Sequence, residues 1–147
     1  MRHLDYPPVW LMGALGVVWC ETLFVPQLVG HAYIQGAGTV LVLLGAVLFG
    51  LAGWAFLRAR STIIPHQTPQ RLITTGIFRL SRNPIYLADV LILVGLSLRW
   101  GAVGGLVLAP VLVWVLHARF IKLEEARIVQ HFGADAQAYF ARTRRWL

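Results

Sequence analysis

Residues 38–57 read GTVLVLLGAVLFGLAGWAFL, a run without a single charged side chain. A helix of about 20 residues rises about 30 Å, which matches the hydrocarbon core of a bilayer. The run therefore predicts a membrane-spanning helix, placed at about residues 37–57. The whole chain has the same character, because 58% of its 147 residues are hydrophobic and 13% are charged, whereas soluble domains average about 25% charged residues.

Further apolar runs predict membrane spans at about residues 8–29, 85–100 and 101–120. The first is expected to be retained rather than cleaved, because MRHLDYPPVW has no strongly basic region and no small-residue cleavage site follows the run. The third run is short, and RWGAVGG at residues 99–105 predicts a tight hairpin into the fourth, which contains Pro110. The sequence thus predicts an all-α integral membrane protein with about four transmembrane helices in a single domain, residues 1–147.

The net charge is +7, and the positions of the basic residues are those typical of a membrane protein. Basic residues flank the apolar runs, which is typical of topological anchors and of contacts with anionic lipid rather than nucleic acid. The loop GHAYIQGAG at residues 30–38 has no Lys or Arg, and Arg99 is the one basic residue expected on that side. The positive-inside rule therefore predicts cytosolic N- and C-termini, in a plasma membrane or a bacterial inner membrane.

The cytosolic segments are then residues 58–84, expected to form an ordered loop, and the helical residues 121–147. Between them the chain reads RLSRNPIYL at residues 79–87. Asn83 and Pro84 are favoured at the cap and the first position of a helix, so they predict where the third span begins. Free N–H groups at that helix end, together with Arg82, suit a carboxylate. The alternative is a capped helix with an anchoring arginine and an interfacial tyrosine.

Acidic residues are few, which makes their positions informative. His117, Glu124 and His131 recur every seven residues and form one helical stripe, which lines either a polar cavity or a solvated face. Asp89 and Glu21 lie inside apolar runs, where ionisable groups are costly and often functional. Asp89 is one turn from Tyr86 and is expected to border the same cavity, whereas Glu21 has no evident partner.

Several other classes of site are disfavoured by the sequence. His3, His31 and His66 lack metal-ligand spacing, and the lone Cys20 excludes an internal disulfide framework. There is no P-loop, and Gly36-Ala37-Gly38 lacks the context of a dinucleotide fingerprint. We therefore expect neither a metal site nor a soluble nucleotide-binding fold.

Two stretches carry a family resemblance: LITTGIFRLSRNPIYL at residues 72–87 and EEARIVQHFGADAQAYFARTRRWL at residues 124–147. In this order they resemble the isoprenylcysteine carboxyl methyltransferase and phospholipid methyltransferase group of integral membrane enzymes, over about residues 58–147. The resemblance implies S-adenosyl-L-methionine as cofactor, held in a cytosolic pocket between the two segments. It assigns cofactor binding to Leu72, Ile73, Gly76, Phe78, Arg82, Asn83, Pro84, Tyr86, Glu124 and Glu125, and more loosely substrate binding to Arg119. Asp89 is a further loose candidate for substrate binding, from its position one turn from Tyr86.

The resemblance also implies methyl transfer to a lipophilic small molecule or a lipid at the cytosolic membrane face. Asn83 stands where the prenylcysteine enzymes have histidine, so the acceptor atom stays open among oxygen, nitrogen and sulfur. Asp89, His117 and His131 are the candidate bases for an acceptor that must lose a proton. Two alternatives remain: a membrane reductase using NADPH, and a non-catalytic membrane protein that packs against a partner. The oligomeric state is left open.

Overall fold

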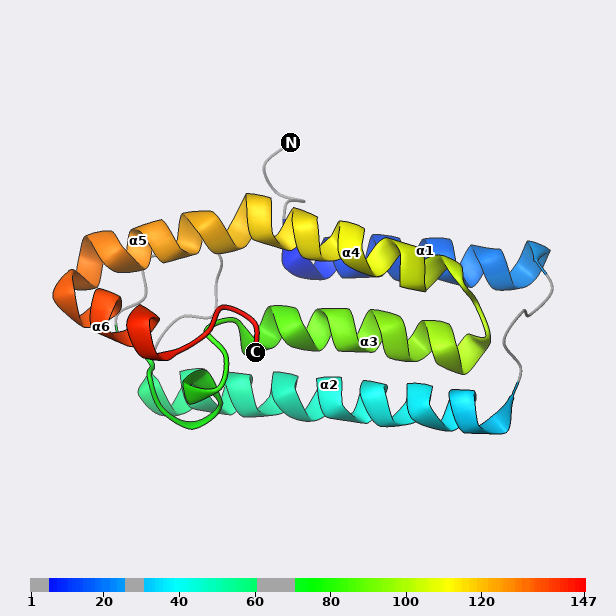
Figure 1. The fold of residues 1–147 in the computed structure, drawn as a ribbon, viewed down its shortest axis with the longest axis horizontal. Helices are drawn as coiled ribbons and strands as arrows, with labels where there is room; N and C mark the ends of the chain where they lie inside the picture. The colour runs from blue at the N-terminus through cyan, green and yellow to red at the C-terminus, as the bar shows by residue number, and fades with distance from the viewer. Residues whose placement is uncertain (1–5, 26–30, 61–70) are drawn as a thin grey trace.

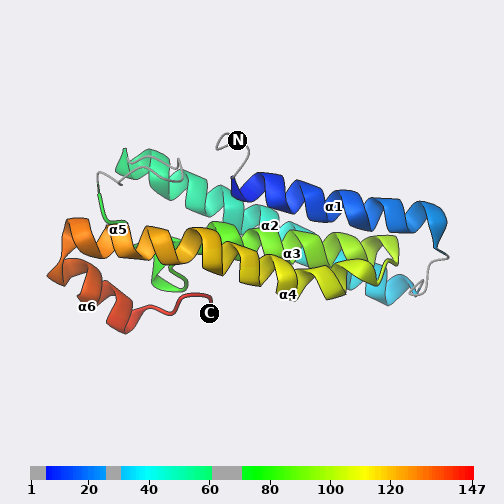
Figure 2. The same cartoon turned by 90° about the horizontal axis from the view of Figure 1, so that it is seen from above.

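The computed structural model describes residues 6–25, 31–60 and 71–147, and within these ranges it contains helices and no strands. The prediction of an all-helical chain is confirmed. Helices α1 to α4 lie side by side and alternate in direction (Figures 1 and 2), and shorter helices follow beyond one end of the bundle. The elements are α1 Pro7–Phe24, α2 Ala32–Ala59, the 3₁₀ helix η2 Gly76–Arg79, α3 Pro84–Trp100, α4 Gly104–Leu116, the π-helix η3 His117–Ile121, α5 Lys122–Phe132 and α6 Ala134–Arg142.

Helices long and apolar enough to cross a membrane are α1, α2 and the continuous helix Gly104–Phe132. Their outward faces expose large apolar side chains, including Leu43, Val47 and Trp114, as expected of surfaces that meet lipid. Helix α3 has 17 residues and rises about 26 Å. It packs against α1, α2 and α4, and is therefore the central helix of the bundle.

Close packing of α2 against α3 explains why α2 begins earlier than predicted. The sequence predicts a start near residue 37, with Gly36-Ala37-Gly38 in a loop, whereas the helix begins at Ala32. A Cβ on Gly38 would lie 2.6 Å from the carbonyl oxygen of Gly95, and a Cβ on Gly95 would lie 2.7 Å from that of Gly38. These glycines let two backbones touch, so here they serve helix packing rather than a turn.

The α3–α4 hairpin forms where RWGAVGG predicts it, and it accounts for Glu21. Gly101 ends α3 with φ 70°, a left-handed conformation that glycine adopts without strain. The carboxylate of Glu21 on α1 then accepts hydrogen bonds from the backbone N–H groups of Val103 at 3.0 Å and Gly104 at 2.8 Å. An acidic side chain at a helix N-terminus satisfies free donors and complements the helix dipole. Glu21 is therefore a cap for α4.

The helix of the fourth apolar run continues without a break into the segment predicted to be helical and cytosolic. The helix passes Pro110 and the π-turn at His117–Ile121, and continues through α5 to Phe132. Single π-turns inside α-helices are frequent at functional sites. Gly133, with φ 51°, then ends α5, and α6 turns back along it (Figure 1). The predicted break near Gly133 is confirmed.

We expect Gly38→Ala to destabilise the protein by about 1–3 kcal/mol, because the new Cβ meets backbone atoms of α3 that have no room to move. Gly50→Ala on the same helix is the control, because a Cβ there meets nothing within 4 Å and alanine is the better helix former. Unfolding of both variants in detergent micelles measures the difference. Equal stability of the two would show that α2 and α3 are not in backbone contact.

Candidate functional site

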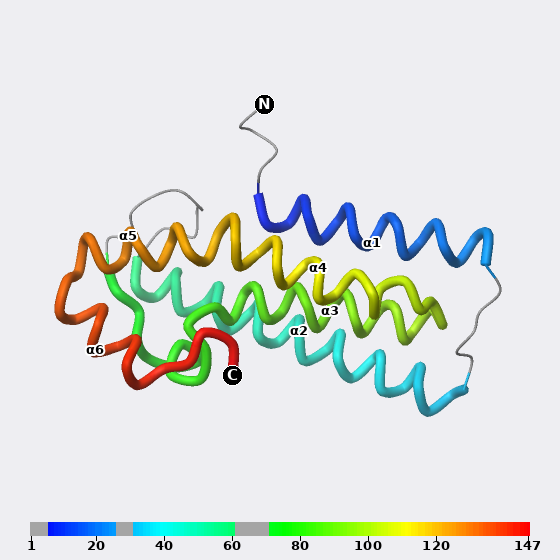
Figure 3. Tube along the Cα trace, turned by 45° about the horizontal axis from the view of Figure 1, so that its top comes forward, coloured from blue at the N-terminus to red at the C-terminus, as the bar shows by residue number. Residues whose placement is uncertain are grey.

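Segments distant in sequence meet beyond the end of the bundle where α3 begins. The loop that contains η2, helices α5 and α6, and the C-terminal tail (residues 143–147) all lie there (Figures 1 and 3). A backbone hydrogen bond of 2.9 Å from the N–H of Arg82 to the carbonyl of Arg144 joins the loop to the tail. The sequence prediction that these segments form one region is consistent with this arrangement.

Asn83 binds the tail instead of capping α3. The helix begins at Pro84 as predicted, and the N–H of Leu87 donates to the carbonyl of Asn83 at 3.0 Å. The side chain makes no capping bond, so that part of the prediction is wrong. Its Nδ2 donates to the carbonyl of Arg145 at 3.0 Å, and the Ser81 hydroxyl donates to the same carbonyl at 3.2 Å. The carbonyl of Arg145 is thus fixed by two side chains from the segment just before α3.

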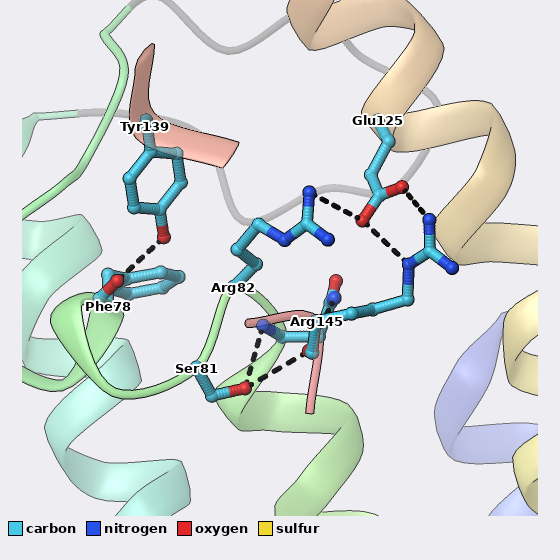
Figure 4. Close-up of polar contacts among 7 residues, drawn as sticks. Phe78, Ser81, Arg82, Glu125, Tyr139 and Arg145 are labelled. Atoms are coloured by element: carbon cyan, nitrogen blue, oxygen red, sulfur yellow. Dashed lines mark hydrogen bonds and ion pairs between the residues drawn. The ribbon is translucent and has the colours of Figure 1, made fainter. Parts of the chain in front are cut away.

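Glu125 on α5 binds two arginines (Figure 4). Arg145 donates through Nε to Oε1 at 2.9 Å and through Nη2 to Oε2 at 2.5 Å. Arg82 places Nη1 3.4 Å from Oε1, and the Glu125 side chain is only 13% exposed. The hydrogen bond to Glu125 raises the pKa of Arg145 above its usual value. Glu125 is therefore the centre of an ion-pair network and not part of a solvated face.

Arg82 is held in place and has an unused donor. Its guanidinium lies over the ring of Phe140, 4.3 Å from the ring centroid, and its side chain is 14% exposed. The Nε atom is buried and has no hydrogen-bond partner among the described residues. A buried donor without a partner costs about 1–3 kcal/mol, which a bound acceptor would offset. Arg82 is therefore arranged as an anion-binding group.

The neighbouring acid, Glu124, pairs with the first turn of α3. The buried hydroxyl of Tyr86 donates to Oε1 of Glu124 at 2.6 Å, and the ring of Tyr86 packs near that of Phe120. One turn further along α3, Asp89 is 2% exposed, and its Oδ2 has no hydrogen-bond partner within the described ranges. Tyr86 thus lies between Glu124 on α5, which it contacts, and Asp89 one turn along α3.

Leu72, Ile73 and Gly76 line a groove of about 620 Å³ against the last turns of α2, together with Trp54 and Arg58. Phe78 does not line this groove; it is buried, with its ring edge-on to that of Phe56 on α2 and ring centroids 5.5 Å apart. Of the four loop residues assigned from the family resemblance, three line the groove and Phe78 packs against α2.

Tyr139 anchors the loop to α6, because its hydroxyl donates to the carbonyl of Phe78 at 2.7 Å (Figure 4). Burial raises the pKa of Tyr139 to about 12, against an ordinary value near 10. The folded state therefore favours the protonated phenol. This contribution to stability is complete below about pH 10 and is lost as the pH rises through about 12.

Some candidates lie apart from this cluster. Arg119 is exposed, with its guanidinium 5.5 Å from the ring centroid of Trp10 on α1. His131 is exposed, so the stripe that it forms with His117 and Glu124 does not line a cavity along its whole length. His3, His66 and residues 61–70 of the predicted loop lie outside the described residues.

Sequence reasoning missed the individual roles of Ser81, Tyr139 and Arg145. The signal for Arg145 was the ending TRRWL, which places charged residues beside Trp146. Trp146 packs partly buried against the hydrophobic core. Because Trp146 packs there, the neighbouring Arg145 is held close to the bundle.

Comparison with known proteins identifies the class of this helical membrane protein. Residues 33–135 match the family model described as phospholipid methyltransferase, so the chain belongs to the phospholipid methyltransferase family. It is 27% identical over 121 residues to a probable protein-S-isoprenylcysteine O-methyltransferase of Oryza sativa subsp. indica, covering 81% of this chain and 63% of that protein. It is likewise 27% identical over 124 residues to protein-S-isoprenylcysteine O-methyltransferase B of Arabidopsis thaliana, covering 83% and 63%. The chain thus spans less than two thirds of the length of these relatives, and no solved structure matches it significantly.

We expect Asn83→Ala to loosen the C-terminal tail and leave α3 intact, because the Asn83 side chain binds the carbonyl of Arg145 and does not cap the helix. Hydrogen exchange measured by mass spectrometry should show faster exchange in residues 143–147 and unchanged exchange in the first turns of α3. Thr75→Ala is the control, an exposed position in the same loop whose side chain makes no capping bond. Faster exchange confined to α3 would instead support a capping role.

Proposed function

We propose that the protein is an S-adenosyl-L-methionine-dependent methyltransferase that acts on a lipophilic or lipid acceptor at the cytosolic membrane face. The observation that carries the proposal is the approach of both acids of Glu124-Glu125 to the RLSRNPIYL segment, through Tyr86 and Arg82. Family membership supports it, as do the methyltransferase names of the relatives. The cofactor fits the chemistry of the residues present, because an unpartnered buried Arg82 Nε suits its carboxylate.

Each end of the cofactor has a proposed set of binding residues. Arg82 and the start of α3 at Asn83-Pro84 would hold the carboxylate. Glu124 and Glu125, with Tyr86 orienting the first of them, would accept hydrogen bonds from the ammonium and the ribose hydroxyls. The adenosine would occupy the loop groove, against a wall of Leu72, Ile73 and Gly76, while Phe78 packs the loop against α2.

When bound, the cofactor supplies an electrophilic methyl group on a sulfonium. The residues of this chain then have the task of alignment and of excluding water, and no covalent nucleophile is needed. Asp89 faces the interior of the bundle with an unpartnered oxygen, one turn from Tyr86, and is the candidate to contact the acceptor. Arg119, on the side of α1, is a second substrate contact at the membrane surface.

The proposed topology has four crossings, with α3 as the third. The direction of the chain reverses at each helix of the bundle (Figure 1), so the start of α1 and the start of α3 face the same side. The loop, α5, α6 and the tail lie beyond that end and carry most of the basic residues. By the positive-inside rule this end is cytosolic. The polar cofactor would then enter from water, while a lipophilic acceptor enters from the bilayer.

One structural feature favours the reductase alternative. Arg58 and Arg71 both line the groove, and guanidinium groups there would suit the 2′-phosphate of NADPH. A protein that only packs against a partner would instead bind neither this nucleotide nor the methyl donor.

We expect calorimetry of the purified protein in detergent to show binding of S-adenosylhomocysteine and none of NADPH. Glu124→Gln should weaken the first ligand by roughly 10-fold, because it removes a charged acceptor. Asp135→Asn, the same change at an exposed position on α6, should bind as the wild type does.

The outcomes separate the three functions. Binding of NADPH alone would replace the methyltransferase with the reductase, and binding of neither ligand would favour the interaction protein. If Glu124→Gln and the wild type bind S-adenosylhomocysteine with equal affinity, the proposed cofactor stands but Glu124 does not contact it.

A further inference from the structure

Two positively charged side chains are held together in the site by one carboxylate. Arg82 from the loop and Arg145 from the tail both contact Glu125. The side chains of Arg82 and Glu125 are 14% and 13% exposed, and that of Arg145 is 36% exposed. Two guanidinium groups and one carboxylate leave a net charge of +1, with two of the three side chains largely withdrawn from solvent. Charge in such an environment is costly unless it is paired, so this cluster has an affinity for a further anion.

The balance of hydrogen-bond donors and acceptors in this cluster also indicates an anionic ligand. Both oxygens of Glu125 already accept hydrogen bonds from Arg145, and Oε1 also lies near Arg82. Each guanidinium has five N–H donors, and the buried Nε of Arg82 has no partner in the described part of the chain. The cluster therefore has donors in excess, and its missing component is an acceptor of negative charge.

Neither arginine needs to be ordered when a ligand arrives. Arg82 lies over the ring of Phe140, and its backbone N–H is bonded to the tail. The backbone of Arg145 is fixed through its carbonyl by Ser81 and Asn83. Side chains that are already positioned lose little conformational entropy on binding, so their hydrogen bonds contribute more fully to affinity.

We infer that Arg145 and Arg82 form a two-arginine cradle for the carboxylate of the bound cofactor, with Glu125 holding the two guanidinium groups in place. The inference rests on the proposed function and changes one role within it. Glu125 becomes a positioning residue whose charge is used by the arginines, and Glu124 remains the acceptor for the cofactor's polar groups. The C-terminal tail thereby becomes part of the ligand site and not only a support for it.

The test compares two ligands that differ only in the carboxylate: S-adenosylhomocysteine and decarboxylated S-adenosylhomocysteine. Affinities are measured by calorimetry for the full-length wild type, Arg145→Gln and Arg144→Gln. We expect Arg145→Gln to weaken S-adenosylhomocysteine by roughly 10- to 100-fold, and to change the affinity for the decarboxylated ligand by less than about twofold. Arg144→Gln is the matched control, because its exposed side chain is adjacent in the tail, and it should bind both ligands as the wild type does.

A conservative variant tests the geometry of the cradle. Arg145→Lys keeps the positive charge but loses the planar pair of donors that Glu125 accepts. It should restore only part of the affinity for S-adenosylhomocysteine, again without affecting the decarboxylated ligand.

Each contrary result overturns a different statement. Equal weakening of both ligands by Arg145→Gln would show that the tail only supports the fold, and no weakening of either would place the carboxylate elsewhere. Both outcomes leave the proposed function intact, because the wild type still binds. A wild type that binds neither ligand would instead overturn the proposed function, and the cradle with it.

Discussion

The interaction on which the site depends is the contact of Glu125 with Arg82 and Arg145 (Figure 4). It joins three separate parts of the chain: α5, the loop before α3 and the C-terminal tail. Removing one member of a buried ion pair costs far more than the pair contributes, because a charge is left without a partner. The three segments are therefore held as a unit, and hydrogen bonds from Ser81, Asn83 and Tyr139 fix their backbones around it.

The packing of the bundle positions this unit beyond the end where α3 begins (Figure 1). Helix α3 is central, and its glycine contacts with α2 set how closely the two backbones approach. Tyr86, in the first turns of α3, is thereby brought to Glu124 on the long helix that continues from α4. Glu21 caps the other end of the α3–α4 hairpin and holds α1 against it. Packing within the bundle therefore determines the geometry of the polar residues beyond its end.

Much of this architecture could be predicted from the sequence, because it depends on local features. Long apolar runs indicate the helices of the bundle, Asn83-Pro84 indicates the start of α3, and Gly133 indicates the end of α5. The start of α2 was predicted too late, because Gly38 looks like a loop residue until its contact with Gly95 is known. The side chain of Asn83 and the partner of Glu21 depend on tertiary contacts that no spacing reveals. For the same reason the sequence assigned Glu125 to the site but could not show that Arg145 binds it.

The claim that the loop, α5 and the tail form one cofactor site is tested most directly by photolabelling with methyl-tritiated S-adenosyl-L-methionine, followed by peptide mapping. The account predicts label in peptides covering residues 71–87 and 117–147, and competition by unlabelled S-adenosylhomocysteine. Competed label confined to α1 or to the first half of α2 would contradict it.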